Sequence, residues 1–272
     1  MPVLHRPGLR ASSWRKISKL VAFLACNMGF SLALKTGGVI PFMYCHGCPL
    51  AAFACPIGAL QHFIGLGEAP LLVAGSLILA FLLLGRSACG WLCPFGALQD
   101  LLARPGEAGA RQDGRWDVKL RYLKLLILLG ALSSSFALSG PTFCWVCPIG
   151  ALFAGIPYLL AHPGWRPGPA FYIHMAILVL VLLLAVRIPR AWCRYLCPLG
   201  AISGCFNKVS LLGIELDEAR CTRCLACLRA CPMGLTSLGQ IGSSPECVLC
   251  AKCLDACPSG ALKATFRTGI GG

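Results

Sequence analysis

Long apolar runs alternate along this chain with short segments rich in cysteine, glycine and proline. Four runs carry few charges, at Ile17–Leu34, Ala69–Leu84, Leu120–Leu138 and Ala170–Ile188. A helix needs about 20 apolar residues to span a bilayer, and the first, third and fourth runs approach that length. The second is shorter because Pro70 and Gly85 bound it. The pattern predicts an α-helical integral membrane protein with four transmembrane helices.

Composition and the placement of charge agree with a membrane protein. Of the 272 residues, 57% are hydrophobic and 12% are charged, against about 25% charged residues in an ordinary soluble domain. Basic residues gather before the first run and between the second and third, at Arg6, Arg10, Arg15, Lys16, Lys19, Arg86, Arg104, Arg111, Arg115 and Lys119. Because cytoplasmic loops collect Lys and Arg, we expect both termini and the middle loop in the cytoplasm. The net charge of +14 is then a topology signal, and we expect no nucleic-acid binding.

One phrase, Cys-Pro-x-Gly-Ala, occurs five times, beginning at Cys55, Cys93, Cys147, Cys197 and Cys257. Each half of the membrane part, residues 1–210, runs in the same order: a helix, an outer cysteine motif, a second helix and an inner cysteine motif. Halves that enter in the same direction form a parallel repeat about an axis along the membrane normal. The repeat predicts that inner motifs face each other and that outer motifs face each other. Proline after each cysteine suits the first turn of a short helix.

The C-terminal segment, residues 211–272, has the most specific motif. The spacing Cys-x-x-Cys-x-x-Cys-x-x-x-Cys-Pro occurs twice, as in bacterial ferredoxins with two 4Fe-4S clusters, where the fourth cysteine of each run binds the other cluster. The Cys-Pro endings and the triplet spacing argue against a zinc ribbon. We therefore expect an α+β two-cluster ferredoxin domain. Its ligand sets are Cys221, Cys224, Cys227 and Cys257 for one cluster, and Cys247, Cys250, Cys253 and Cys231 for the other.

The inner motifs are matched Cys-x-x-x-Cys-Pro pairs. Cys89 and Cys93 belong to the first half, and Cys193 and Cys197 to the second. Together they supply four thiolates, the usual ligand number of a 4Fe-4S cluster. Inert buried cysteines are the alternative, since free cysteine is commonly buried. Because the pairs occupy matched repeat positions, we expect a third cluster here.

The outer motifs hold five cysteines, and two chemistries are open to them. These thiols face an oxidising compartment, where disulfides persist. Against disulfides, the motif from Cys144 to Ala151 copies the metal-type spacing, and Cys55 begins a matching phrase. The ligand set we favour for a fourth cluster is Cys48, Cys55, Cys144 and Cys147, with Cys45 as the spare or as an alternative ligand. Cys26 and Cys205 are interpreted as packing residues.

Histidine is too scarce to indicate a haem. The chain has five histidines and no Cys-x-x-Cys-His motif, so a c-type haem is not expected. Only His174 lies in an apolar run. His62, Glu68 and His162 fall at the outer edge, where they could accept protons from a quinol or serve as ordinary interfacial residues.

The motifs at Cys89–Pro94, Cys193–Pro198, Cys221–Pro232 and Cys247–Pro258 resemble those of the NapH family of ferredoxin-type membrane proteins, to which MauN and the C-terminal half of NosR are related. The resemblance extends from about Ile17 to Ala264. It implies a quinol dehydrogenase or electron-transfer subunit of the bacterial inner membrane that works with a partner iron–sulfur protein or reductase. The outer motifs, Cys45–Pro56 and Cys144–Pro148, depart from the NapH pattern and leave the partner and the direction of electron flow open.

The leading hypothesis is therefore a membrane-bound iron–sulfur protein that passes electrons between the quinone pool and a redox partner. No nucleophile or acid–base constellation points to other catalysis. An alternative is a maturation factor that supplies electrons for assembly of another metalloenzyme. Lost respiration in a deletion strain would favour the first hypothesis, and loss of one enzyme's cofactor the second. A simple membrane anchor for the ferredoxin domain would leave the inner cysteines dispensable.

Overall fold

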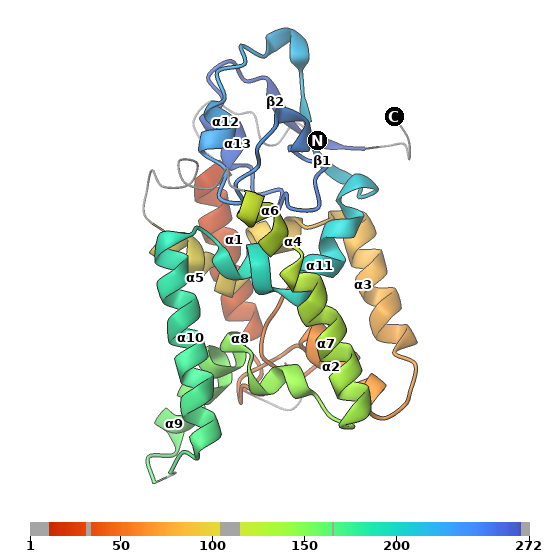
Figure 1. Cartoon of the computed structure of the whole chain (residues 1–272), viewed down its shortest axis with the longest axis vertical. Coiled ribbons are helices and arrows are strands. Elements are labelled where there is room, and N and C mark those ends of the chain that lie inside the picture. Colours follow the sequence, from red (N-terminus) through yellow and green to blue (C-terminus); the bar gives the residue numbers. More distant parts are fainter. Residues whose placement is uncertain (1–10, 31–33, 104–114, 165, 268–272) are drawn as a thin grey trace.

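The computed structural model describes residues 11–30, 34–103, 115–164 and 166–267. The long helices are α1 (Ala11–Cys26), α3 (Leu71–Leu84), α7 (Leu123–Ala137) and α10 (Pro169–Arg187), which run along the long axis of the molecule (Figure 1). A short helix, α6 (Arg115–Leu120), leads into α7. Several predictions fall outside the described residues: the basic residues Arg6, Arg10, Arg104 and Arg111, and part of the first apolar run.

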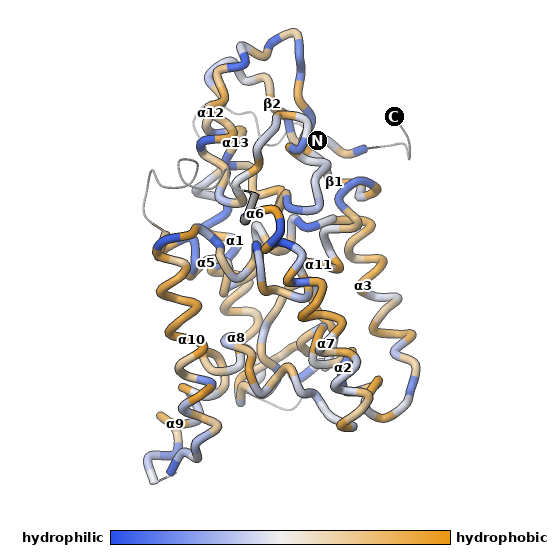
Figure 2. Tube along the Cα trace, viewed as in Figure 1, coloured by the Kyte–Doolittle hydropathy of each residue, from blue (hydrophilic) through white to orange (hydrophobic). Residues whose placement is uncertain are grey.

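Two helical segments, not four, have the length and composition of a membrane span. They are Asp117–Ala137, which joins α6 and α7, and Pro169–Arg187. Only 17% of either apolar window is buried, unlike a core helix of a soluble protein, and Figure 2 shows that both helices are mostly hydrophobic along their length. Over the residues that the structure describes, α1 and α3 are shorter than a span, so two of the four predicted spans are found. Helix α1 ends at Cys26, where Asn27 bonds back to Phe23, and α3 ends at Gly85, whose φ is +57°.

A short helix follows each cysteine–proline pair of the membrane part. These are α2 (Pro56–Gly65), α5 (Pro94–Leu102), α8 (Pro148–Gly150) and α11 (Pro198–Cys205). Helix α8 continues through a π-helical turn, η3 (Ala151–Gly155), into α9 (Ile156–Ala161). Proline occupies the first turn of each, as the sequence predicts. Helices α2 and α8 lie at the end far from the ferredoxin-like part, and α5 and α11 lie near it (Figure 1).

The two halves of the membrane part pack onto each other through these short helices. From the first half, α2 packs on α7 and α5 packs on α10, and from the second half α11 packs on α7 and α2. Two further short segments precede the inner cysteine–proline pairs, α4 (Ser87–Trp91) and the π-helical turn η4 (Trp192–Leu196), and η2 (Thr142–Trp145) precedes α8. The amides of Cys93 and Cys197 each bond to the carbonyl five residues earlier, at 3.1 and 2.8 Å. The repeat is thus present in backbone geometry as well as in sequence.

The ferredoxin-like part follows η5 (Phe206–Lys208). Strands β1 (Leu212–Leu216) and β2 (Leu262–Phe266) form an antiparallel pair, with Leu212 opposite Phe266. Between them lie η6 (Glu218–Arg220), α12 (Ala226–Arg229), η7 (Leu238–Gln240) and α13 (Lys252–Ala256). A separate apolar core, which includes Ile214, Leu235, Leu249 and Leu262, holds this part together.

A layer of buried ion pairs joins the two parts. Within the membrane part, Asp100 on α5 accepts from Arg190 at 2.7 and 3.0 Å and pairs with Lys19 of α1 at 2.6 Å. Across the junction, Asp100 lies 3.6 Å from Lys252 of the ferredoxin-like part. Glu246 of the ferredoxin-like part pairs with Arg86 at 3.5 Å and with Lys124. Buried charges require such partners, because an uncompensated charge in the interior is strongly unfavourable. The layer therefore fixes how the two parts are oriented.

Candidate metal centres

The cysteines of the ferredoxin-like part lie close together, and their interactions only partly follow the two sets that the spacing predicts. The thiol of Cys227 interacts with those of Cys224 and Cys257. The thiol of Cys253 interacts with Cys250, Cys247 and Cys231, and also with Cys227 of the other predicted set. We call the two predicted sets the distal and proximal sites, because only the second lies against the membrane part. Ligation of iron by these thiols, and by Cys221 beside the distal group, stays a prediction.

The backbone around the two sites is repeated residue for residue. Arg223 and Leu225 have φ of +51° and +57°, and the matched residues Leu249 and Ala251 have φ of +46° and +60°. A left-handed conformation costs a non-glycine residue about 1–3 kcal/mol unless the surroundings impose it. Four such residues, each beside a cysteine, show a backbone held in the cysteine-wrapping form. Gly234 and Gly260 take positive φ at matched positions and carry no such penalty.

Thiol acidity differs between the two sites. Despite partial burial, the Ser259 hydroxyl and nearby amides lower the pKa of Cys257, and the Ala226 amide lowers that of Cys224. Burial raises the pKa of Cys247 to about 11. Iron binds the thiolate form, so loading the proximal site releases protons that these buried thiols hold at neutral pH.

The inner cysteines converge on one buried site near the ferredoxin-like part. The thiol of Cys193 interacts electrostatically with those of Cys93, Cys89 and Cys197. All four residues are less than 9% exposed. Cys89 and Cys93 come from α4 and its end, and Cys193 and Cys197 from η4 and its end. The structure thus brings together the four thiols that the repeat predicts as partners.

Two arginines beside the inner site occupy matched positions in the two halves of the repeat. Arg86 donates to the carbonyl of Cys193 at 2.7 Å, and Arg190 donates to the carbonyl of Cys89 at 3.5 Å. Each arginine lies three residues before the first cysteine of its own pair and contacts the first cysteine of the other pair. Arg86 and Arg190 are 1% and 0% exposed. Two buried cations at a site of neutral thiols are unusual, and they suit an anionic cluster.

Hydrogen-bond donors at the inner site also obey the repeat. Gln99 donates to the thiol sulfur of Cys193 at 3.3 Å. Ser203, six residues after Cys197 as Gln99 is six after Cys93, lies beside the thiol of Cys89. Buried donor atoms without a partner remain here, namely Arg86 Nε, Trp192 Nε1 and Ser203 Oγ. Buried donors normally find an acceptor, so four thiols, two cations and spare donors fit a 4Fe-4S cluster, whose sulfides accept hydrogen bonds.

The inner and proximal sites touch. Cys89 packs in one small apolar cluster with Val248, Cys250 and Met233. A Cβ on Gly90 would lie 2.4 Å from the carbonyl oxygen of Val248. The two backbone segments therefore approach each other as closely as a glycine allows. The neighbouring Trp91 donates to the carbonyl of Leu249 at 2.9 Å. The contact between membrane and ferredoxin-like carriers is therefore made through the first cysteine pair.

The outer cysteines form a further group at the opposite end. Cys45, Cys55, Cys144 and Cys147 line one cavity of about 130 Å³. Cys48, which the sequence analysis favoured over Cys45, lies instead beside the phenol of Tyr44. All these side chains are free thiols. The structure therefore places Cys45, and not Cys48, with the other three outer thiols.

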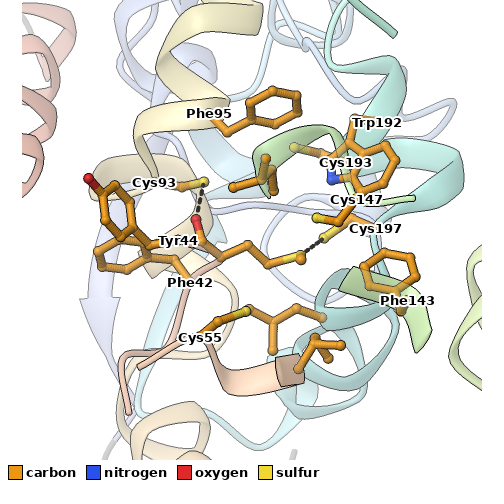
Figure 3. Packing of buried hydrophobic residues seen from close by; sticks show 14 of the residues in the cluster. Phe42, Tyr44, Cys55, Cys93, Phe95, Phe143, Cys147, Trp192, Cys193 and Cys197 are labelled. Atoms are coloured by element: carbon orange, nitrogen blue, oxygen red, sulfur yellow. Dashed lines mark hydrogen bonds between the residues drawn. The ribbon is translucent and has the colours of Figure 1, made fainter. Parts of the chain in front are cut away.

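Met43 separates the inner from the outer thiols. Met43 contacts Cys93 and Cys197 of the inner site and lines the outer cavity together with Cys55; these three cysteines are labelled in Figure 3. Met43 is 3% exposed. One buried side chain thus contacts both membrane sites.

Among the described residues, no three His, Cys, Asp or Glu side chains converge tightly enough to hold a single metal ion. Zinc binds thiolates at about 2.3 Å and draws them close together. A four-iron cluster holds its cysteine sulfurs farther apart, because iron and sulfide occupy the space between them.

The arginines are functional residues that the sequence analysis missed. The available signal was Arg-x-x-Cys-x-x-x-Cys-Pro, which begins at Arg86 and again at Arg190. Arg86 was counted only as a topology signal, and Arg190 was not considered. Of the edge residues, His62 lines a large cavity described below, whereas His162 stacks on Tyr158 with ring centroids 4.3 Å apart.

Comparison with protein families agrees with these sites. A 4Fe-4S binding domain family matches residues 52–69, 66–111, 120–162 and 168–215, which contain the outer and inner Cys-Pro phrases. A second 4Fe-4S binding domain family matches residues 214–235, the first cysteine run of the ferredoxin-like part. No solved structure matches the chain.

Curated proteins with similar sequences carry ferredoxin-type names. Ferredoxin-type protein NapH of Haemophilus influenzae is 30% identical over 228 residues, 80% of this chain and 74% of that protein. Methylamine utilization ferredoxin-type protein MauN of Methylorubrum extorquens is 32% identical over 234 residues, 82% of this chain and 76% of that protein. Regulatory protein NosR of Pseudomonas aeruginosa is 34% identical over 163 residues, 56% of this chain and 21% of that protein.

Proposed function

The chain belongs to the NapH- and MauN-like family of ferredoxin-type proteins, and from that premise we propose that it carries single electrons between the membrane quinone pool and a partner redox protein. A bound 4Fe-4S cluster accepts or releases one electron. The chain's own residues would hold three such clusters in sequence, at the inner, proximal and distal sites. The observation that carries this proposal is the contact of Cys89 with Cys250, which joins the inner site to the ferredoxin-like part.

The three proposed cluster sites differ in charge and exposure, as expected for carriers with different reduction potentials. Arg86 and Arg190 surround the inner site with buried positive charge. The proximal site is enclosed, and among the distal thiols Cys224 is exposed. Because net charge, hydrogen bonds and exposure set cluster potentials, the three environments favour different potentials. The exposed distal site is where we propose that the partner iron–sulfur protein or reductase docks.

A large cavity supports the quinone end of the proposal. It has a volume of about 630 Å³ and lies at the end far from the ferredoxin-like part, lined by residues of α2, α3 and the extended segments before them, including Gly38, His46, Ala59, His62, Val73 and Ser76. Sites for organic ligands commonly measure about 300–1,000 Å³, with mostly apolar walls and few polar groups. Oxidation of a quinol releases two electrons and two protons. His46 and His62 are the imidazoles placed to accept protons there.

A bacterial inner-membrane location with a cytoplasmic ferredoxin domain completes the proposal. Basic residues at the ferredoxin end, among them Arg15, Lys19, Arg121 and Lys124, support that orientation, since cytoplasmic segments collect positive charge. A membrane-impermeant maleimide tests it, because Cys205 is exposed and lies outside the predicted ligand sets. Inverted vesicles should be labelled and right-side-out spheroplasts should not, with Cys205→Ser as the control. Labelling of spheroplasts alone would contradict the orientation.

The quinone proposal is tested by anaerobic addition of a short-chain quinol to oxidised protein. We expect cluster signals in electron paramagnetic resonance. In Gly38→Phe, whose new ring would enter the cavity, quinol reduction should slow at least tenfold while dithionite reduction is unchanged. Gly164→Phe is the matched control, since an added Cβ there meets no atom within 4 Å and Gly164 does not line the cavity. Clusters that dithionite reduces and no quinol reaches in the unaltered protein would contradict the quinone link.

A further inference from the structure

We propose that Cys45, Cys55, Cys144 and Cys147 hold a fourth 4Fe-4S cluster, at the end of the membrane part far from the ferredoxin-like domain. This outer cluster extends the proposed function, because it would stand between the quinone cavity and the inner site. The four thiols line one cavity of about 130 Å³. The thiols of Cys144 and Cys147 each interact with those of Cys55 and Cys45 across the two halves of the chain.

The outer site repeats the framework of the inner one. The phrase Cys-Pro-x-Gly-Ala-Leu-Gln occurs at residues 55–61 and at residues 93–99. At the inner site, Gln99 Oε1 accepts from the amide of Trp192, the residue before Cys193, at 3.1 Å. At the outer site, Gln61 Oε1 accepts from the amide of Phe143, the residue before Cys144, at 2.9 Å. Both glutamines are fully buried. The same device therefore positions the second half's first cysteine at both ends of the membrane part.

In three of the four membrane-part phrases the glycine makes room for a cation or an imidazole, whereas Gly96 faces the Cys89 carbonyl. At the inner site, a Cβ on Gly200 would lie 2.6 Å from a guanidinium nitrogen of Arg86. At the outer site, a Cβ on Gly58 would lie 2.6 Å from Cε1 of His46, and one on Gly150 would lie 3.3 Å from Cε1 of His174. Histidines thus occupy, at the outer site, the place that arginine has at the inner site. The amides of Gly58 and Gly150 also approach the Cys55 and Cys147 sulfurs, without full hydrogen-bond geometry.

Cys45 is the fourth ligand because Cys48 is held elsewhere. The inner pair of the first half has its first cysteine four residues before the Cys-Pro cysteine, and the corresponding outer position is Ala51. A ligand must therefore come from the preceding loop. Cys45 lines the cavity, whereas Cys48 is buried against Tyr44, whose hydroxyl donates to Asn27 at 2.6 Å. Replacement of Cys45 should therefore lower the iron content, whereas replacement of Cys48 should not.

The outer cluster would complete a route from the quinone cavity to the ferredoxin-like domain. His46 and Gly58 line both the outer thiol cavity and the 630 Å³ cavity. On the other side, Met43 lines the outer cavity and touches Cys93 and Cys197. A cluster held by the outer thiols therefore lies in contact with groups that reach both neighbours.

The test is a comparison of Cys45→Ser with Cys48→Ser in full-length protein purified without oxygen. Iron and acid-labile sulfide are measured per chain. The proposal predicts about sixteen irons in the unaltered protein and in Cys48→Ser, and about twelve in Cys45→Ser, taking four irons per cluster. Retention of the ferredoxin signals in electron paramagnetic resonance shows that the serine variant has folded. Cys144→Ser should behave as Cys45→Ser does and provides a second, independent variant.

Two results would overturn the proposal. Equal iron content in Cys45→Ser, Cys144→Ser and the unaltered protein would show that these thiols bind no cluster. A disulfide between any two of the four, found by alkylation and mass spectrometry of unreduced protein, would assign them to an oxidised pair instead. Cys93→Ser separates this question from the proposed function, because it removes an inner ligand. If Cys93→Ser loses iron and Cys45→Ser loses none, the outer cluster is refuted, and the proposed electron carrier is left intact.

Discussion

The thioether sulfur of Met43 lies 3.5 Å from the thiol sulfur of Cys197, and the carbonyl oxygen of Met43 lies 4.0 Å from that of Cys93 (Figure 3). One residue of the segment between α1 and α2 thus reaches both halves of the inner site. Because the same residue lines the outer cavity, it fixes the separation between the two membrane sites.

Two substitutions at Met43 test whether the volume of its side chain, and not its sulfur atom, is what the fold requires. Met43→Leu keeps the volume, so we expect full iron content and a loss of less than about 1.5 kcal/mol in the free energy of unfolding. Met43→Ala opens a cavity in the buried core and should cost about 2–5 kcal/mol. Unfolding in detergent, followed by circular dichroism, measures both variants. Equal stability of the two would contradict the tight packing of this residue between the sites.

The contact between the inner and proximal sites depends on Gly90, which has no side chain. A Cβ on Gly90 would lie 2.4 Å from the Val248 carbonyl, so Gly90→Ala should push the ferredoxin-like domain away and slow electron transfer from the inner cluster at least tenfold. Gly75→Ala is the matched control. An added Cβ at Gly75, within α3, meets nothing within 4 Å, and alanine stabilises a helix by about 1 kcal/mol relative to glycine. Flash reduction with optical detection compares the rates, and equal rates in both variants would refute this junction.

Gln99 should tune the potential of the inner cluster. Its side chain donates to the Cys193 sulfur at 3.3 Å and accepts from the Trp192 amide at 3.1 Å. In Gln99→Leu the sulfur loses a hydrogen bond, so the reduced cluster is less stabilised and its potential should fall. Affinity for the cluster should also fall, about 10- to 100-fold as for other residues that orient metal ligands. A redox titration followed by electron paramagnetic resonance measures the shift. Gln61→Leu, the matched residue at the outer site, should leave the inner potential unchanged.

The ion pair of Asp100 with Arg190 should stabilise the membrane part next to its junction with the ferredoxin-like part. Asp100→Asn leaves Arg190, which is 0% exposed, without its counter-charge, and removing one partner of a buried pair costs about 3–5 kcal/mol. Glu215→Gln is the control, because Glu215 is 55% exposed and lies 4.0 Å from Arg267. Exposed pairs contribute less than about 1 kcal/mol. A similar loss of stability in both variants would contradict the structural role of the buried layer.

The same carboxylate predicts a pH dependence. Burial alone would raise the pKa of Asp100, but Arg190, Lys19 and Lys252 hold that pKa well below its ordinary value. A group whose pKa is lower in the folded state stabilises the fold at any pH above its unfolded pKa of about 4, and loses that contribution as the pH falls further. Helix content should therefore be insensitive to pH near neutrality and decrease below about pH 4. Asp100→Asn should lose less stability over that acid range than the unaltered protein does.

Much of the cysteine chemistry could be predicted because it is local in sequence. The spacing from Cys221 and from Cys247 predicts two thiol sets, and the structure brings the thiols of both runs close together, with a link between the sets from Cys253 to Cys227. The repeat likewise predicts that Cys89 and Cys93 face Cys193 and Cys197. Motifs of this kind are recognisable because ligand spacing and the turns between ligands are set by a few neighbouring residues.

Features that depend on packing between distant segments were not predicted. Helix lengths depended on where Cys26 and Gly85 end their helices, and apolar composition alone gave four spans instead of two. The choice of Cys45 over Cys48 depends on Tyr44 and Asn27, which bury the second thiol. Of the two arginines beside the inner site, Arg86 was assigned to loop charge and Arg190 was not considered, because their contacts cross from one half of the chain to the other.

The central claim is that the inner thiols hold a cluster that links the membrane part to the ferredoxin-like domain. Iron and acid-labile sulfide in anaerobically purified protein, compared with a Cys93→Ala, Cys197→Ala double variant, test it most directly. The account predicts a loss of about four irons and four sulfides per chain in the double variant, with the ferredoxin signals retained. Identical iron and sulfide in the two proteins would contradict it and leave the membrane part as an anchor.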